Sequence, residues 1–281
     1  MPVREPAVQG LFYPNSKALL EKQFQKILPN LQHEGKANAA ISAHAGLIYS
    51  GVTAGKSINE LAAKKNYIIL CPNHTGMGEA LSVFPEGKWK TVLGETEINK
   101  ELSEKICEKI PEASLDETAH TQEHSAEMQL LLLQKKFSNQ RFENFQTQSL
   151  KKFSNFKIAV ICIAEQNLEV LKKLGKCLAE LSQEFEFCLI ASSDFTHFEP
   201  EESAKEKDLK AIEKILANDA EGFYKIVEEK NLSICGFAGI TALLEFAKIK
   251  GLQGKLLEYA SSAKTTHDSS NVVGYASIIF D

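Results

Sequence analysis

Residues 67–74 read YIILCPNH, an unbroken apolar run followed at once by Pro, Asn and His. A run of this length without polar alternation is typical of a strand buried on both faces of a parallel sheet. Two similar runs follow at 157–163 (KIAVICI) and 187–191 (FCLIA), and a shorter one precedes them at 39–43. These four runs predict the centre of one parallel sheet.

Helical apolar spacing fills the chain between and around these strands. It occurs at 16–28, 51–63, 97–110, 122–137, 167–184, 199–217, 219–230 and 237–248, and two further strands are predicted at 255–261 and 272–280. Alternating strands and helices predict an α/β sandwich, a largely parallel central sheet flanked by helices, with the last two strands paired antiparallel. Residues 138–154 are polar with scattered Phe and predict an irregular insertion. We expect a single domain over residues 1–281.

Composition excludes several classes of protein. The 281 residues include 32 Lys plus Arg and 37 Asp plus Glu, so the net charge is 32 − 37 = −5, which argues against a nucleic-acid partner. No apolar run approaches the roughly 20 residues of a membrane span, and residues 1–6 resemble no secretion signal. Six cysteines without a C-x-x-C pair indicate reduced thiols. A cytoplasmic protein without a membrane partner is expected.

Three histidines follow predicted strands. His44 follows 39–43, His74 follows 67–71 and His197 follows 187–191. Because the carboxyl ends of parallel strands form the ligand crevice of open α/β sheets, we expect the three rings to share a site. The alternative is that each imidazole hydrogen-bonds its own loop backbone.

Two further residues carry possible chemistry. Asp194 is three residues before His197, and a carboxylate beside an imidazole suits general acid–base work, although Asp194 can equally form a turn or a helix cap. Cys235 immediately precedes an apolar helix, and a helix N-terminus lowers a thiol pKa and favours a nucleophile or metal ligand. The alternative is a small buried residue at a turn.

Three weaker motifs are set aside or left open. Residues 50–57 (SGVTAGKS) approach a phosphate-binding loop but lack its first Gly and a strand running into it. Residues 120–124 (HTQEH) match a zinc-protease pattern that needs both His on one helix, whereas Thr121 is predicted as the helix N-cap. His124 and Glu127 share a helix face and either cap the helix or add to the site.

The motifs AHAGLIYSG, PNHTGMG, TQEHSAEMQL, SSDFTHFE, ICGFAGI and DSSNVVGYAS, in this order, resemble the Memo family, also called AmmeMemoRadiSam system protein B. The resemblance spans residues 8–280. It implies the fold of the class III extradiol dioxygenases. It also implies a metal-binding triad at His44, His74 and Cys235, with Asp194 and His197 as catalytic pocket partners and His124 near them.

The resemblance implies a transition metal, iron, copper or zinc, but not dioxygenase activity. Those dioxygenases hold Fe(II) with two His and a carboxylate, whereas the third position here is Cys235, a softer ligand. The predicted function is therefore a metal-dependent redox enzyme acting on an unidentified small substrate. The alternative is a non-catalytic metal-carrying or peptide-binding adaptor that works with a radical-SAM partner.

Overall fold

A nine-stranded sheet forms the centre of the computed structural model, which describes residues 2–28, 35–138, 141–143, 150–152 and 156–281. From one edge to the other its strands are β12 (His197–Glu199), β14 (Val272–Phe280), β2 (Ala39–Ser42), β11 (Phe187–Ser192), β3 (Asn66–Pro72), β10 (Lys157–Ile163), β4 (Leu81–Val83) and β7 (Ser114–Leu115), with β13 (Gly254–Ser261) paired to β14.

The four central strands are parallel, as predicted. β11 lies between β2 and β3, and β10 pairs with the other side of β3, with all three pairings parallel. β14 runs antiparallel to β2, and β13 runs antiparallel to β14, which confirms the predicted pairing of the last two strands. β4 adds an antiparallel strand beside β10.

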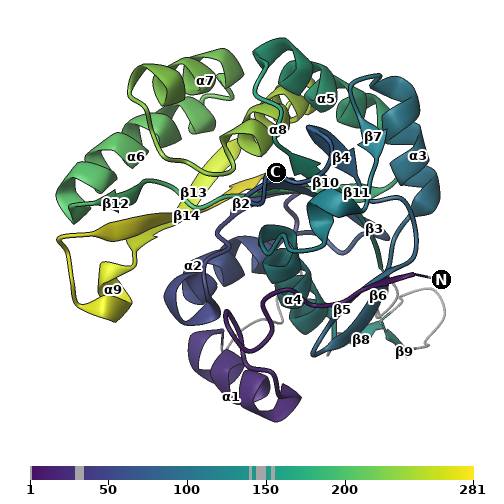
Figure 1. The fold of residues 1–281 in the computed structure, drawn as a ribbon, viewed down its shortest axis with the longest axis horizontal. Helices are drawn as coiled ribbons and strands as arrows, with labels where there is room; N and C mark the ends of the chain where they lie inside the picture. The colour runs from purple at the N-terminus through teal and green to yellow at the C-terminus, as the bar shows by residue number, and fades with distance from the viewer. Residues whose placement is uncertain (1, 29–34, 139–140, 144–149, 153–155) are drawn as a thin grey trace.

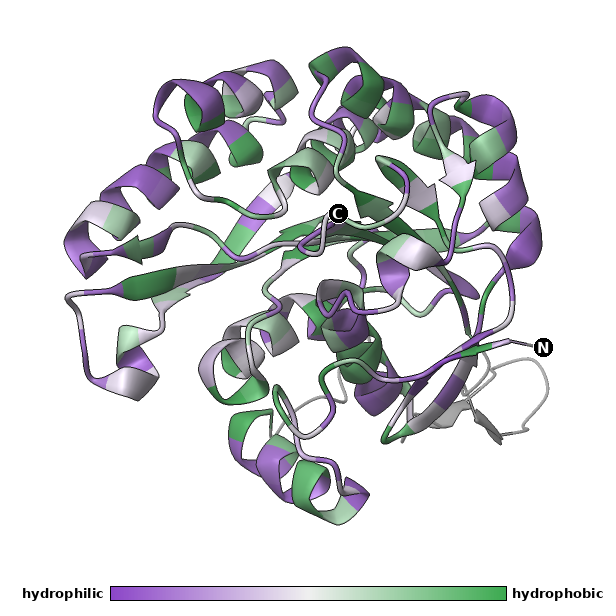
Figure 2. Cartoon of the chain, viewed as in Figure 1, coloured by the Kyte–Doolittle hydropathy of each residue, from purple (hydrophilic) through white to green (hydrophobic). Residues whose placement is uncertain are grey.

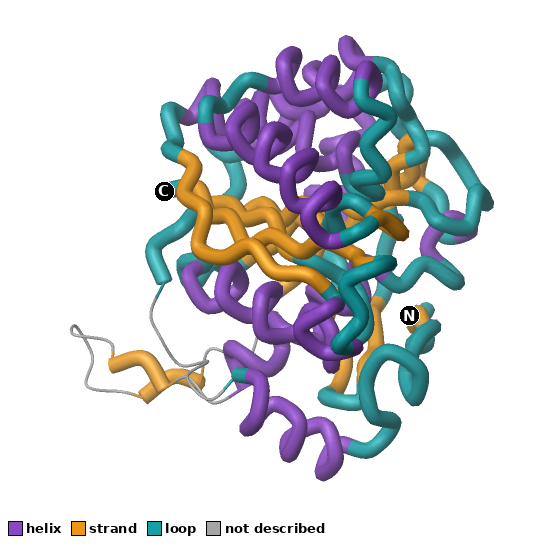
Figure 3. The backbone as a smooth tube through the Cα atoms, turned by 90° about the vertical axis from the view of Figure 1, so that its left-hand side faces the viewer, coloured by secondary structure: helices purple, strands orange, loops and turns teal. Residues whose placement is uncertain are grey.

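Helices cover both faces of this sheet (Figures 1 and 3). One layer holds α3 (Lys100–Lys109), α5 (Leu168–Leu181), α6 (Glu201–Leu216), α7 (Ala220–Glu229) and α8 (Phe237–Lys250). The other holds α1 (Lys17–Ile27), α2 (Leu47–Glu60) and α4 (Ser125–Ser138). The short helices are η1 (Thr118–His120) and α9 (Ala263–Thr266). This arrangement confirms the predicted mixed α/β class.

Each face of the sheet has its own apolar core. In β3, Ile68 and Leu70 pack into the core shared with α5 and α8, whereas Tyr67 and Ile69 pack into the core shared with α2 and α4. Figure 2 shows the apolar strands between helices whose outer faces are polar. Burial on both faces explains why the strand sequences are continuous apolar runs. The single domain stays a prediction.

Two local predictions are wrong, and one small sheet was missed. α2 begins at Leu47, not at residue 51, so residues 50–57 lie inside a helix and form no phosphate-binding loop. α4 begins at Ser125, so Thr121 is not its N-cap. A small sheet of β1 (Val3–Arg4), β5 (Lys88–Thr91) and β6 (Gly94–Glu97) was missed, because short strands with polar residues give little periodic signal.

Within 138–154, β8 (Arg141–Glu143) and β9 (Leu150–Lys152) pair antiparallel, and most of the segment lies outside the described residues. Among the described helices, none has the length and apolar character to cross a bilayer.

Candidate metal centre

Three possible metal ligands converge at the carboxyl end of the parallel strands. His44 lies just after β2, His74 just after β3, and Cys235 just before α8. One ligand atom from each lies within 4.8 Å of the others. The topology explains this convergence, because β2 and β3 flank β11 and end at the same edge, where the segment leading into α8 also arrives.

The ring of His44 is held so that one particular nitrogen faces Cys235. Its Nδ1 lies 2.9 Å from Ser192 Oγ. Ser192 donates its own hydroxyl proton to the Ser125 carbonyl at 2.9 Å and accepts from Gln129 Nε2 at 2.8 Å. The hydroxyl proton is thus used, so Nδ1 of His44 must carry a proton and donate it. That tautomer leaves the lone pair on Nε2, which lies 3.2 Å from the Cys235 Sγ.

The ring of His74 is fixed in the same tautomer by Glu123. The carboxylate accepts from the His74 backbone N–H at 2.7 Å and from Nδ1 at 2.9 Å. It also accepts from the backbone and the hydroxyl of Ser125. Burial alone raises the pKa of Glu123, but these hydrogen bonds, first among them the one from the His74 ring, hold it well below its usual range. Nε2 of His74 is therefore left available to a ligand.

Asp194 and His197 do not pair with each other as predicted. The Asp194 carboxylate accepts from the backbone N–H of His44 at 2.8 Å. The His197 ring instead donates from Nδ1 to the Ser233 carbonyl at 2.7 Å, and the His197 N–H donates to Ser233 Oγ. The reason is geometric: Asp194 turns back toward the end of β2, whereas His197 opens β12 on the far side of β14. Burial raises the pKa of Asp194 to about 6, against the opposing effects of the His44 N–H and the charge of His197.

Comparison with known proteins decides the family. The family model described as Memo-like protein matches residues 4–279. Proteins described as MEMO1 family are 38% identical in Methanosarcina mazei, over 100% of each chain, and 36% identical in Sulfurisphaera tokodaii, over 99% of each. This chain belongs to the Memo family. A crystal structure of an uncharacterized Escherichia coli K12 protein has a similar fold, with TM-score 0.56 and 13% identity over 87% of this chain and 100% of that one.

Cys235 of this Memo chain is partly buried. Burial, with the charge of Asp194, raises the pKa of its thiol well above the usual range. This direction is opposite to the one that a helix N-terminus favours, and Cys235 lies before the N-cap residue Gly236 of α8. A bound metal would have to displace the thiol proton.

Gly236 sets the position of Cys235. A Cβ on Gly236 would lie 2.3 Å from the Ser192 carbonyl oxygen and 2.6 Å from Ser193 Cβ. The residue must therefore be Gly for the segment before α8 to lie against the end of β11. The Asp194 backbone N–H then donates to the Cys235 Sγ at 3.2 Å.

His124 lies beside His44 and His74. Its ring stacks on His74 with centroids 4.6 Å apart and meets His44 edge-on at 5.4 Å. The ring of Phe12 also meets the His124 ring edge-on, with centroids 4.8 Å apart. Burial lowers the pKa of His124 and lowers that of His44 well below its usual range, so both rings are neutral near pH 7. Neutral imidazole is the form that binds metals.

The residues of the zinc-protease-like motif separate in the structure. His120 lies in η1, buried, with Nε2 3.0 Å from Ser82 Oγ, and is not on one helix with His124. The sequence left open whether Glu127, like His124, caps a helix or adds to the site. Glu127 does not line the site. Its carboxylate accepts from Arg4, from Ala7 N–H and from Tyr13 OH, and so anchors the N-terminal segment.

Sequence reasoning missed Glu123 as the residue that orients His74. The sequence does place Glu123 next to the candidate residue His124, at the start of a predicted helix. What was lacking is any sequence feature that links residue 123 to residue 74. Only the packing of the segment before α4 against the end of β3 brings them together.

Proposed function

We propose that His44, His74 and Cys235 bind one transition metal ion, namely iron, copper or zinc. The observation that supports this proposal is the convergence of the three donor atoms within 4.8 Å, with both rings held as Nδ1–H tautomers. Metal-binding His residues characteristically donate their other ring N–H to a carboxylate, hydroxyl or carbonyl partner. Ser192 and Glu123 fill that place here.

The donor set fits a borderline to soft metal. Two neutral imidazoles and one thiolate suit copper, zinc and iron better than Mg²⁺ or Ca²⁺, which prefer oxygen ligands. Three protein ligands leave a coordination position open, as in catalytic rather than structural sites. When bound, the ion would supply Lewis-acid or redox chemistry to a molecule at that position.

We propose further that the protein is a metal-dependent oxidoreductase of a small substrate. His197 is the candidate proton carrier, because Ser233 takes its Nδ1–H and leaves Nε2 as an acceptor. Asp194 holds the His44 backbone, and His124 borders the two rings. In this proposal His197 moves the proton, whereas Asp194 and His124 shape the place where the substrate lies.

One observation favours a non-catalytic adaptor. Phe198, next to His197, is 76% exposed and has a positive φ of 58°, which is costly for an aromatic residue. A strained, exposed ring next to His197 suits contact with a peptide or a partner, such as a radical-SAM protein. In that function the metal would be carried and not used for turnover.

Metal analysis of the reduced protein tests the site. Cys235→Ser and His44→Ala should each lose the bound metal, measured by mass spectrometry of the purified protein and by titration with Cu(I), Zn(II) and Fe(II). The controls are Cys177→Ser, a buried thiol on α5, and His267→Ala, an exposed histidine. Equal metal content in all four variants would reject the proposal.

Oxygen consumption then separates the two functions. Metal-loaded protein is supplied with a panel of catechols and thiols. Turnover on any of them that disappears in Cys235→Ser supports the enzyme. Retained metal with no turnover across the panel supports the carrier or adaptor.

A further inference from the structure

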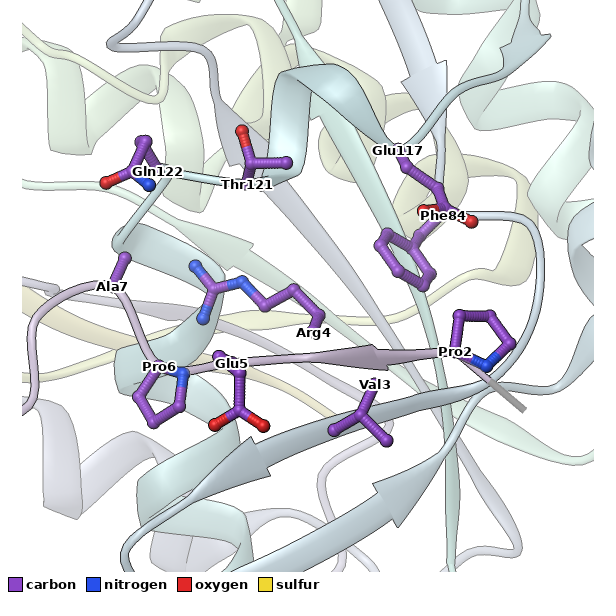
Figure 4. A pocket seen from close by; sticks show the side chains of 10 residues that line it. All are labelled: Pro2, Val3, Arg4, Glu5, Pro6, Ala7, Phe84, Glu117, Thr121 and Gln122. Atoms are coloured by element: carbon purple, nitrogen blue, oxygen red, sulfur yellow. The ribbon is translucent and has the colours of Figure 1, made fainter.

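A second pocket lies away from the metal centre, beside the small sheet. It has a volume of about 360 Å³. Figure 4 shows its two walls: the chain from Pro2 to Ala7 runs along one, and Glu117, Thr121 and Gln122 lie along the other. None of the three candidate metal ligands lines it.

The wall formed by β1 has a free backbone edge. Among the residues that the structure describes, β1 lies at the edge of the small sheet and pairs only with β5, in parallel. Lys88 N–H donates to the Pro2 carbonyl at 3.0 Å. Because main-chain groups of successive strand residues point to alternate sides, those of Val3 and Glu5 point away from β5, toward the pocket. An open edge of this kind is a template for one more strand.

The length of this edge is limited on the side of Glu5. Ala7 is the next residue on the same side, and its N–H already donates to the Glu127 carboxylate at 2.7 Å, so the free edge ends at Glu5. Val3 is 38% exposed and lines the pocket. The volume lies at the lower end of the roughly 300–1,000 Å³ of ligand pockets, so it accommodates a few residues and not a long strand.

Of the charged side chains that line this pocket, the one without an ion-pair partner among the described residues is a carboxylate. The Arg4 guanidinium lies in the floor, but it is bound by Glu127 and by the carbonyls of Glu123 and His120, and it stacks over Trp89 at 4.4 Å. Glu5 is paired with Lys90 at 2.9 Å. Glu117 is exposed and forms no ion pair with any described residue. A cationic group is therefore the complement of the wall opposite β1.

We propose that this pocket binds a short, extended, basic segment of a partner protein. The segment pairs its backbone with Val3 and Glu5 along the free edge of β1 and places a Lys or Arg side chain at Glu117. Strand addition to an open edge supplies affinity through main-chain hydrogen bonds, and one side-chain contact supplies selectivity. This site is independent of the proposed metal centre.

The test uses a fluorescein-labelled five-residue peptide of alternating Thr and Val with Lys at its centre, followed by fluorescence anisotropy. The wild type should bind it more tightly than the matched peptide with Glu at the centre. Val3→Pro removes the N–H that faces the pocket and leaves the β1–β5 ladder intact, so affinity should fall about tenfold, as expected for the loss of a main-chain hydrogen bond. Val3→Thr is the control.

The charged contact is tested separately. Glu117→Gln should weaken binding about two- to fivefold and flatten its salt dependence, as for an exposed ion pair. Glu202→Gln, an exposed carboxylate of α6, should change nothing. Should Val3→Pro fail to fold, a peptide methylated on its backbone nitrogens provides the same test on the wild type, and it should not bind.

Three results would overturn the proposal. The first is no binding of the Lys peptide up to millimolar concentration. The second is equal displacement of the peptide by N-acetyl-lysine amide, which would make this a site for a small cation. The third is binding that ignores Val3→Pro and Glu117→Gln but is lost in Cys235→Ser, which would place the peptide at the metal centre.

Discussion

The Glu123 carboxylate accepts two hydrogen bonds from His74, one from its backbone N–H and one from its ring Nδ1, although 49 residues separate the two in sequence. The two bonds fix both the start of the loop after β3 and the rotation of the ring. Glu123 itself is fully buried and receives Ser125 as a further donor. A side chain with this many donors is a positioning residue, and several experiments follow from it and its neighbours.

Glu123→Gln should weaken metal binding without removing a proposed ligand. The amide keeps one acceptor oxygen but loses the charge that holds Nδ1–H of His74. Loss of such an outer partner typically costs about 10–100-fold in metal affinity. Competition against a chelator measures it, with Glu202→Gln as the control for a lost surface carboxylate. Unchanged affinity would mean that His74 is not a ligand.

His197→Ala should keep the metal and lose turnover. Its ring is held by Ser233 and not by the candidate ligands, so metal content should be preserved. Removal of a general acid–base group typically costs about 10²–10⁴-fold in rate. Oxygen consumption on whichever panel compound turns over gives the rate, with His267→Ala as the control. A variant that arrives without metal would instead make His197 a ligand.

Arg4→Met should be strongly destabilising. It leaves the buried carboxylate of Glu127 without its cation, and breaking one side of a buried pair typically costs about 3–5 kcal/mol. Urea unfolding measures the loss. Lys90→Met, which removes an exposed ion pair with Glu5, should cost no more than about 1 kcal/mol.

The double variant completes this test. Arg4→Met with Glu127→Gln removes both charges, so its loss of stability should be smaller than the sum of the two single losses. Strict additivity would show that the two side chains do not stabilise each other in the folded state.

His120 should make the fold sensitive to mild acid. Burial lowers the pKa of His120 to about 4, whereas an unfolded chain titrates near 6.5. Between these values the unfolded state binds more protons, so stability falls as the pH falls from about 6.5 to 4. The loss attributable to this group is on the order of 3 kcal/mol.

Unfolding curves at pH 7, 5.5 and 4 measure this loss. His120→Phe should flatten the dependence over that window, although it also removes the contact with Ser82 Oγ. The same pH slope in wild type and His120→Phe would assign the acid sensitivity to other groups.

The sequence predicted the sheet and the meeting place of the strand-end residues for a simple reason. A parallel sheet buried on both faces leaves unbroken apolar runs, and whatever follows such a run must lie at the same edge. His44 and His74 could be placed in this way without knowledge of any side-chain contact. Their role as ligands, like that of Cys235, stays a prediction.

The remaining features depend on contacts that no local pattern encodes. Asp194 and His197 are close in sequence, yet β12 carries His197 to Ser233 while Asp194 turns to His44. The place of Cys235 before a helix left two alternatives open for its thiol, and the burial that raises its pKa depends on neighbouring segments. Spacing along the chain says where a group emerges, not which partner it meets.

The contact between Cys235 Sγ and His44 Nε2 spans 191 residues and joins the second strand of the chain to the start of its last long helix. Closing so long a loop has a high entropic cost, and it is compensated only once the intervening strands have paired. We therefore expect the centre to be among the last parts of the molecule to assemble. A nascent or partly folded chain exposes a free thiol there, so the rate at which Cys235 becomes protected from alkylation reports the completion of folding.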